Sequence, residues 1–395
     1  MRTPEESAAR LARRMAGIEP FHVMELLARA RDLEAAGRSI VHMEIGEPDF
    51  PTPEPIREAG ARALREGDLY YTPALGLPRL REAISGYYRA RYGLDVPAER
   101  VIVTTGASGA LMLACAALVG PGDEVLLADP GYPANRHFVR VMEGVPRAIA
   151  VDAASGYQLA PEHLERCWGP RTVAALIASP SNPTGTTVSS ERLSAMAGLA
   201  RARGGVLVVD EIYHGLVYEG QCATALAVAD DAFVINSFSK YFSMTGWRLG
   251  WMVAPRAYVR EIEKLAQNLY LAPPTLAQHA ALAAFEPGTL AILEARVKEF
   301  KARRDYLVPA LRALGFDIPV TPQGAFYIYA GCGRLTGDSF AFARELLEQA
   351  GVAITPGIDF GSNAPERHVR FAYTNSLERL QEGVRRIGEF LRVIA

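Results

Sequence analysis

The sequence contains very little lysine. Of its 42 basic residues only four are lysines, at positions 240, 264, 298 and 301, and the other 38 are arginines. Because guanidinium stays protonated near neutral pH, such a chain retains lysine by chance or where an amine has to lose its proton. Lys264, Lys298 and Lys301 fall in charged helical patterns that indicate solvent exposure. Lys240 follows the apolar run 233–237 and precedes a glycine-containing turn, which predicts an amine at the end of a buried strand.

Cysteine, excess charge and long apolar runs are also scarce. The four cysteines form no Cys-x-x-Cys pair, and none of the seven histidines belongs to a metal-ligand motif. The net charge of −2 gives no basic excess for nucleic acid. The longest apolar run, residues 109–119, is too short to span a bilayer, and the charged N-terminus lacks the apolar region of a signal peptide. We therefore expect a soluble, cytoplasmic protein with reduced cysteines, no metal, no nucleic-acid partner and no membrane contact.

Apolar segments alternate with helical segments between residues 101 and 237. Runs that are apolar throughout are typical of parallel strands in a sheet covered on both faces. The pattern therefore predicts an α/β fold with a mostly parallel central sheet. Strands are expected at residues 101–105, 124–128, 173–178, 206–210 and 233–237, with helices after Gly106, after Pro133 and from Ser190.

The pattern changes near residue 285, where a long charged helix leads to shorter strands and helices that predict a smaller α+β domain. In the N-terminal segment, residues 21–30 have the spacing of an amphipathic helix, and a charged helix-like segment precedes them. We predict an N-terminal arm at residues 1–50 that forms part of the small domain, a large domain at 51–285 and a small C-terminal domain at 286–395. The expected elements of the last part are helices at 292–314, 338–350 and 377–392 and strands at 325–329, 352–355 and 368–373.

Polar residues follow the expected strands where each one ends. The carboxyl ends of parallel strands share one edge of a sheet, and ligands collect there. Residues 106–109 (Gly-Ala-Ser-Gly) start a helix, which fits either an anion site or a simple capped helix start, and they match no dinucleotide or P-loop pattern. Tyr132, Asn182 and Asp210 follow other strands, and each alone is compatible with turn chemistry. Lys240 is either a Schiff-base lysine or an ordinary loop lysine.

Two residues outside this region also indicate a site. Gly46 interrupts an extended segment, where a glycine either lets the backbone approach a ligand closely or makes a simple turn. Arg370 lies within an apolar strand pattern, where an unpaired guanidinium is costly. It needs an anion, which is either a ligand or the carboxylate of a buried structural ion pair.

Five motifs together resemble the class I and II aminotransferases, the pyridoxal-phosphate enzymes of fold type I that include aspartate aminotransferase. The resemblance runs from about residue 21 to the C-terminus. It implies a homodimer with shared active sites that binds pyridoxal 5′-phosphate. The motifs are residues 182–185 (Asn-Pro-Thr-Gly), 210–213 (Asp-Glu-Ile-Tyr), 237–240 (Ser-Phe-Ser-Lys), 246–250 (Gly-Trp-Arg-Leu-Gly) and Arg370.

The resemblance also implies a role for each matching residue. Lys240 would form the Schiff base with the cofactor and then move the substrate Cα proton, while Asp210 would keep the pyridine nitrogen protonated. Asn182 and Tyr213 would hydrogen-bond the phenolic oxygen of the ring. The other implied contacts are Ala107, Ser108, Ser237 and Arg248 for the phosphate, Gly106 and Ser239 as further cofactor contacts, Tyr132 stacked on the ring, Tyr71 reaching the partner's phosphate, and Gly46, Asn182 and Arg370 for the substrate.

The implied reaction is a ping-pong transfer of an amino group between an L-amino acid and a 2-oxo acid, with glutamate and 2-oxoglutarate as the expected pair. The sequence does not indicate which second arginine would bind the distal carboxylate of a dicarboxylic substrate. We rank broad or aspartate/alanine-type specificity first and aromatic specificity second. Tyr270 and Phe360 are candidates for an apolar side-chain pocket or for packing. Lyases that eliminate at Cβ or Cγ use the same scaffold and remain an alternative. A non-catalytic ligand-binding regulator is a third, although no DNA-binding helix pair is evident.

Overall fold

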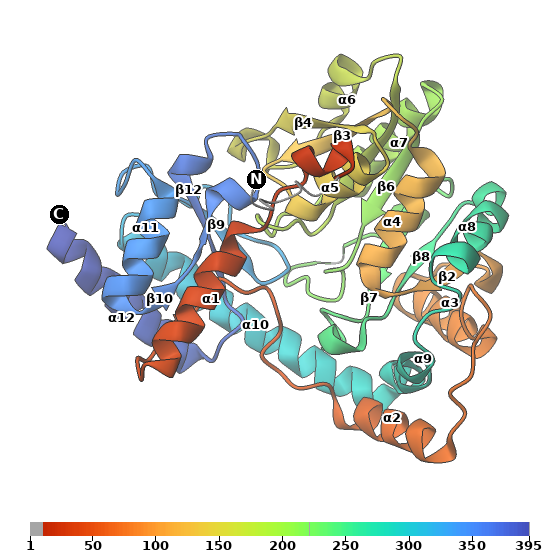
Figure 1. Cartoon of the computed structure of the whole chain (residues 1–395), viewed down its shortest axis with the longest axis horizontal. Helices are drawn as coiled ribbons and strands as arrows, with labels where there is room; N and C mark the ends of the chain where they lie inside the picture. Colours follow the sequence, from red (N-terminus) through yellow and green to blue (C-terminus); the bar gives the residue numbers. More distant parts are fainter. Residues whose placement is uncertain (1–10, 221, 395) are drawn as a thin grey trace, which may run out of the picture.

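A seven-stranded sheet forms the centre of the computed structural model, which describes residues 11–220 and 222–394 (Figure 1). The strand order is β2-β8-β7-β6-β5-β3-β4. Only β8 runs antiparallel to its neighbours, so the mostly parallel sheet is confirmed. The strands are β2 (Val101–Thr104), β3 (Glu124–Asp129), β4 (Val145–Ala150), β5 (Thr172–Ala178), β6 (Val206–Asp210), β7 (Phe233–Ser237) and β8 (Gly250–Val253).

Both faces of this sheet are covered, as its apolar strands predict. Consecutive side chains of β5 alternate between two apolar cores: Ala174 and Leu176 belong to one, and Ala175 and Ile177 to the other. The first core is closed by α4 (Gly106–Leu118), α5 (Pro133–Val141) and α8 (Arg256–Leu269), and the second by α3 (Pro78–Tyr92), α6 (Pro161–Cys167) and α7 (Ser190–Ala202).

The C-terminal part forms a second, smaller α+β unit. In Figure 1 the long helix α10 (Pro287–Ala313) runs from beside α9 (Thr275–Ala281) to this part. Its three-stranded antiparallel sheet has the order β11-β12-β9. The elements are β9 (Tyr327–Gly331), α11 (Ser339–Glu345), β10 (Val352–Ala353), β11 (Thr355–Pro356), β12 (His368–Ala372) and α12 (Leu377–Ile394).

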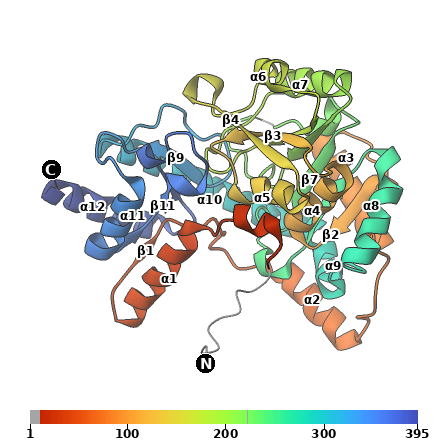
Figure 2. The same cartoon turned by 45° about the horizontal axis from the view of Figure 1, so that its top comes forward.

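The N-terminal segment packs on this C-terminal part, although nearly the whole sequence separates the two. Strand β1 (Val41–His42) pairs in parallel with β10, and α1 (His22–Ala35) contacts β10 and β11. In both views α1 lies beside the C-terminal part (Figures 1 and 2). The chain then crosses to α2 (Glu54–Glu66), which packs against α9. This route carries the segment after β1 past the carboxyl edge of the central sheet. No helix within the described residues is long and apolar enough to cross a membrane.

Some elements differ from those expected. The edge strand β4 and the antiparallel strand β8 are additional, and β4 escapes detection because most of its side chains are at least partly exposed. The expected helix over residues 338–350 ends as an α-helix at Glu345 and continues as a wider π-type turn to Ala350. The charged helix-like segment before residue 21 falls partly on residues 1–10, which lie outside the described residues; Arg13–Gly17 form a short 3₁₀ helix.

Candidate active site

Two adjoining cavities of about 210 and 330 Å³ lie at the carboxyl edge of the central sheet. They share several lining residues, Lys240 and Tyr132 among them. Of the residues predicted from the sequence, Gly106 and Tyr71 line neither cavity; Gly106 lies against the Arg248 guanidinium, and Tyr71 is 84% exposed. The others come together here: Gly46, Ala107, Ser108, Tyr132, Asn182, Asp210, Tyr213, Ser237, Ser239, Lys240, Arg248 and Arg370.

Lys240 follows β7, and its amine lies between the central sheet and the segment after β1. Its Nζ donates a hydrogen bond to the backbone oxygen of Gly46 at 2.6 Å. Burial lowers the pKa of this amine to about 8, against the attraction of Glu47. A Cβ on Gly46 would lie 1.9 Å from the Tyr327 hydroxyl, so only glycine fits without rearrangement. Glycine at this position therefore lets the backbone pack closely against Tyr327, and the Lys240 amine is hydrogen-bonded to that backbone.

Asp210 is the last residue of β6 and is buried. Its Oδ1 accepts a hydrogen bond from the backbone N–H of Ile212 at 3.1 Å. Burial raises the pKa of this carboxyl to about 6, although the Ile212 N–H and the charge of Lys240 oppose the rise. Within the described part of the chain no basic side chain forms a salt bridge with Asp210. The Asp210 carboxylate is therefore available to pair with a cationic group of a ligand.

Arg370 lies in β12 and is only 6% exposed. Within residues 11–220 and 222–394 it forms no salt bridge, and its buried Nε has no hydrogen-bond partner. The interpretation as a structural ion pair is therefore wrong for the described residues. A buried guanidinium without an anionic partner is stabilised when an anionic ligand binds to it. Its neutral partners are Asn182 Oδ1 at 2.9 Å, the Glu44 backbone oxygen at 2.5 Å and Thr355 Oγ1 at 3.1 Å.

Tyr327 is a site residue that the sequence did not reveal. Its hydroxyl is 2.9 Å from that of Tyr213, and its ring centroid is 4.4 Å from the Arg370 guanidinium. The only available signal was strand pairing: Arg370 pairs with Tyr329, two residues from Tyr327 on the same face of β9. That register is visible only once β9 and β12 are known to be neighbours. The same holds for Glu44 and Thr355, which contact Arg370.

The start of α4, Arg248 and Ser237 bring several hydrogen-bond donors to the cavity that Lys240 also lines. Ala107 and Ser108 lie in the first turn of α4, where backbone N–H groups have no partner within the helix. A Cβ on Gly106 would lie 2.9 Å from Nη2 of Arg248, so the guanidinium lies directly against this helix start. Ser237 Oγ accepts the backbone N–H of Ser239 at 3.0 Å, which orders the loop before Lys240. This donor set fits a phosphate group.

The family model for aminotransferases of class I and II matches residues 38–387. The chain belongs to this family. It is 38% identical to the (5-formylfuran-3-yl)methyl phosphate transaminase of Methanocaldococcus jannaschii, over 96% of this chain and 99% of that protein. It is also 38% identical to the valine–pyruvate aminotransferase of Mycobacterium tuberculosis, over 95% and 97%. The crystal structure of an aminotransferase from Mycobacterium tuberculosis superposes with a TM-score of 0.93 at 38% identity, over 97% of this chain and 99% of the other.

Membership makes the chain an aminotransferase with the α/β fold of type I. The family is generally dependent on pyridoxal phosphate and acts on amino acids and 2-oxo acids. The relatives carry different substrate names, so the family alone does not define the substrate of this chain. That question depends on the residues around the two cavities.

Proposed function

We propose that the enzyme binds pyridoxal 5′-phosphate at Lys240 and moves an amino group between an L-amino acid and a 2-oxo acid, with glutamate and 2-oxoglutarate as one pair. The observation that supports this most strongly is the arrangement of three buried groups. The Lys240 amine, with its pKa lowered to about 8, lies in one cavity with the acid Asp210 and the arginine Arg370. In the described residues neither Asp210 nor Arg370 forms a salt bridge, so each can take a charged ligand group.

The residues present fit each part of this cofactor. The first turn of α4, with Ala107 and Ser108, and the Arg248 guanidinium would hold the phosphate. Tyr132 would cover the ring, and Asp210 would pair with its nitrogen. When bound, the cofactor supplies a carbonyl that reacts with amines and a ring that accepts the electrons left by the Cα proton.

The chain's own groups divide the remaining work. Arg370, positioned by its contact with Asn182, would bind the substrate α-carboxylate with its unused donors. The neutral amine of Lys240 would accept the Cα proton and return it, as a general base near its working pH. Tyr213, which is hydrogen-bonded to Tyr327, would donate to the phenolic oxygen.

A half-reaction experiment tests this function. The protein is loaded with pyridoxal phosphate, and single amino acids are added without any 2-oxo acid. We expect the visible absorption to bleach stoichiometrically and to return when 2-oxoglutarate is added. Release of ammonia and pyruvate without an acceptor would instead support the lyase alternative, and a protein that the cofactor does not colour would contradict both.

We further propose that the enzyme is a cytoplasmic homodimer. Two neighbouring segments expose large apolar side chains: Leu69, Tyr70 and Tyr71 in one, and Leu269 and Leu271 in the other. The backbone oxygen of Tyr70 accepts a hydrogen bond from Thr275, which brings the segments together. Exposed large apolar side chains on two adjoining segments support a protein interface.

A further inference from the structure

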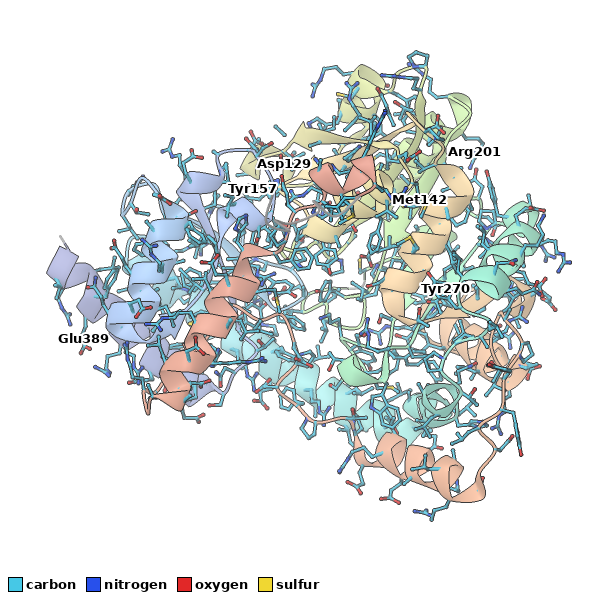
Figure 3. All side chains as sticks on the ribbon, viewed as in Figure 1. Asp129, Met142, Tyr157, Arg201, Tyr270 and Glu389 are labelled. Carbon is cyan, nitrogen blue, oxygen red and sulfur yellow. The ribbon has the colours of Figure 1, made fainter. Side chains whose placement is uncertain are left out.

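A third cavity, of about 400 Å³, lies beside the two catalytic cavities. It is enclosed by the carboxyl ends of β3 and β5, by α5 and by the loop over residues 358–362. Figure 3 labels Asp129, which lines it, where the central strands approach the C-terminal part. Tyr132, Ala178 and Phe360 line both this cavity and the catalytic one. The two spaces are therefore separated by a few side chains only.

The walls of this cavity are of two kinds. Some of the lining residues are apolar, with Leu127, Leu159 and Leu176 among them. Two others are the arginines Arg136 and Arg140 of α5. An occupant that matches both kinds of residue has an apolar body and an anionic group.

Two acids also line the cavity, and neither neutralises Arg136 directly. The carboxylate of Asp129 already accepts the backbone N–H and the hydroxyl of Ser362, each at 2.9 Å. Glu19 is exposed and forms no salt bridge with Arg136 within the described residues. Arg140 donates to the backbone oxygen of Gly17 and so holds the N-terminal segment.

Arg136 has unused hydrogen-bonding capacity. Its Nη2 donates to the Asp359 backbone oxygen at 2.8 Å, while its Nε is buried and, among the described residues, has no partner. Burial lowers the pKa of this guanidinium, which shows that its desolvation exceeds the help from nearby acids such as Glu19. The neighbouring Asn135 is only 6% exposed, and its Oδ1 also lacks a partner in the described part of the chain. Buried polar groups left in this state favour a ligand.

We propose that this cavity is the subsite for the substrate side chain and that Arg136 binds an anionic group, a carboxylate or a phosphate, at the end of that side chain. The proposal rests on the proposed function, in which Arg370 binds the α-carboxylate. The Arg370 guanidinium is 4.9 Å from the Phe360 ring, and Phe360 also lines the third cavity. Arg136 donates to the backbone oxygen of Asp359, the residue before Phe360, so a side chain that passes Phe360 comes near this guanidinium. Apolar residues such as Leu127 and Leu159 line the same cavity, so the preferred substrates are amino acids and 2-oxo acids whose side chains combine an apolar part with a terminal anion.

A purely structural role for Arg136 makes a different prediction. The hydrogen bond of Arg136 to the Asp359 backbone oxygen stabilises the loop that contains Asp359. The Asp359 carboxylate in turn accepts the backbone N–H groups of His22 and Val23, at 2.7 and 2.9 Å. If Arg136 served only this loop, its loss would weaken all substrates alike. The charge of the side chain would then make no difference.

The test compares amino donors of increasing length that end in a carboxylate, from aspartate to 2-aminosuberate, with uncharged donors of matched length. Values of kcat/KM are measured for the wild type, Arg136→Gln and Arg136→Lys. The control is Arg201→Gln, since Arg201 pairs with Asp231 on the surface and lines none of these cavities (Figure 3). The preference is the ratio of kcat/KM for the charged donor to kcat/KM for the uncharged donor of the same length. In the wild type we expect this ratio to increase with chain length. In Arg136→Gln we expect it to be about 10- to 100-fold lower than in the wild type, mainly because KM for the charged donor rises. Arg136→Lys should retain part of the wild-type preference for charged donors, and Arg201→Gln should retain all of it.

The remaining outcomes are each decisive. An equal loss for charged and uncharged donors in Arg136→Gln would overturn the subsite and leave aminotransfer intact. A preference for charged donors that is unchanged in Arg136→Gln would also overturn the subsite and leave aminotransfer intact. If the wild type transfers an amino group from no donor in the series, the proposed function itself fails. Donors that end in a phosphate instead of a carboxylate establish which anion the site prefers.

Discussion

Burial controls the protonation of the groups around Lys240. The amine and Asp210 lie in the same cavity, and desolvation favours the neutral form of each, so the pKa of Lys240 falls to about 8 and that of Asp210 rises to about 6. Their mutual attraction opposes both shifts without cancelling them. A substantial fraction of the Lys240 amine is therefore neutral slightly above neutral pH, where it can act as a nucleophile and a base.

This lowered pKa predicts how the ligand-free enzyme reacts with its cofactor. Only the neutral amine attacks a carbonyl, so the rate of covalent attachment of pyridoxal phosphate should rise about tenfold per pH unit below pH 8 and level off above it. Absorbance stopped-flow traces between pH 6 and 10 measure the rate. Lys240→Ala serves as the control without covalent attachment. A midpoint near 10.5, the ordinary value for lysine, would contradict the role of burial.

Arg370 should act on every substrate in the same way. In Arg370→Gln the α-carboxylate loses its charged partner, so kcat/KM should fall about 10- to 100-fold for charged and uncharged donors alike. Steady-state kinetics with alanine and glutamate measure this, and the visible spectrum of the bound cofactor serves as the control for the intact site. A loss restricted to glutamate would show that Arg370 binds a side chain instead.

At the scale of elements, α1 and β1 are joined by a charged side-chain bridge. His42 in β1 is 2.6 Å from the buried Glu44 through Nδ1 and 3.1 Å from Glu34 of α1 through Nε2. The hydrogen bond with Glu44 raises the pKa of His42 to about 9, despite partial desolvation. Glu44 in turn presents its backbone oxygen to Arg370. The bridge thus supports the segment that forms one wall of the active site.

A raised histidine pKa gives a definite sign to the pH dependence of stability. The bridge contributes fully below pH 6.5, the unfolded value, and its contribution is lost as the pH rises to about 9. The wild type should therefore exceed His42→Gln in Tm by roughly 2–4 °C at pH 6, and the difference should disappear near pH 10. Thermal unfolding of the ligand-free proteins at several pH values checks this. A difference independent of pH would mean that packing, not charge, explains the effect.

The sequence predicted the elements whose pattern is strong. β6 and β7 coincide with the apolar runs that end in Asp210 and Ser237, because buried parallel strands need no polar face. The exposed edge strand β4 and the three-dimensional neighbours of Arg370 could not be obtained in this way. Tyr327 joins the site through a strand pairing that links distant segments, and the unpartnered state of Arg136 appears only when α5 is packed on the sheet. Tyr270, a sequence candidate for the side-chain pocket, lies outside the catalytic cavities, whereas Phe360 lines one.

At the scale of the whole molecule, we propose the division into an arm at residues 1–50, a large domain at 51–285 and a small domain at 286–395. The pairing of β1 with β10 supports the assignment of the arm to the small domain. The catalytic cavity draws Lys240 and Asp210 from the central sheet and Arg370 from the C-terminal part. A substrate held by Arg370 would therefore connect the two domains.

The proposed dimer gives a prediction at this scale. Tyr71 is 84% exposed in one chain, and in the dimer its hydroxyl would reach the phosphate site of the partner subunit. Tyr71→Phe should keep the wild-type dimer in sedimentation velocity but weaken cofactor binding about tenfold, because one charge-assisted hydrogen bond is lost. Tyr70→Phe, at the equally exposed neighbouring position, is the matched control. A monomer in solution, or unchanged cofactor affinity in Tyr71→Phe, would refute the shared site.

The most direct test of the account is to locate the covalent attachment of the cofactor. The protein is loaded with pyridoxal phosphate, reduced with borohydride, digested and examined by peptide mass spectrometry. We expect the added mass on the peptide that contains Lys240 and on none that contains Lys264, Lys298 or Lys301. Modification of another lysine with Lys240 unmodified, or no stable attachment at all, would contradict the central role given to Lys240.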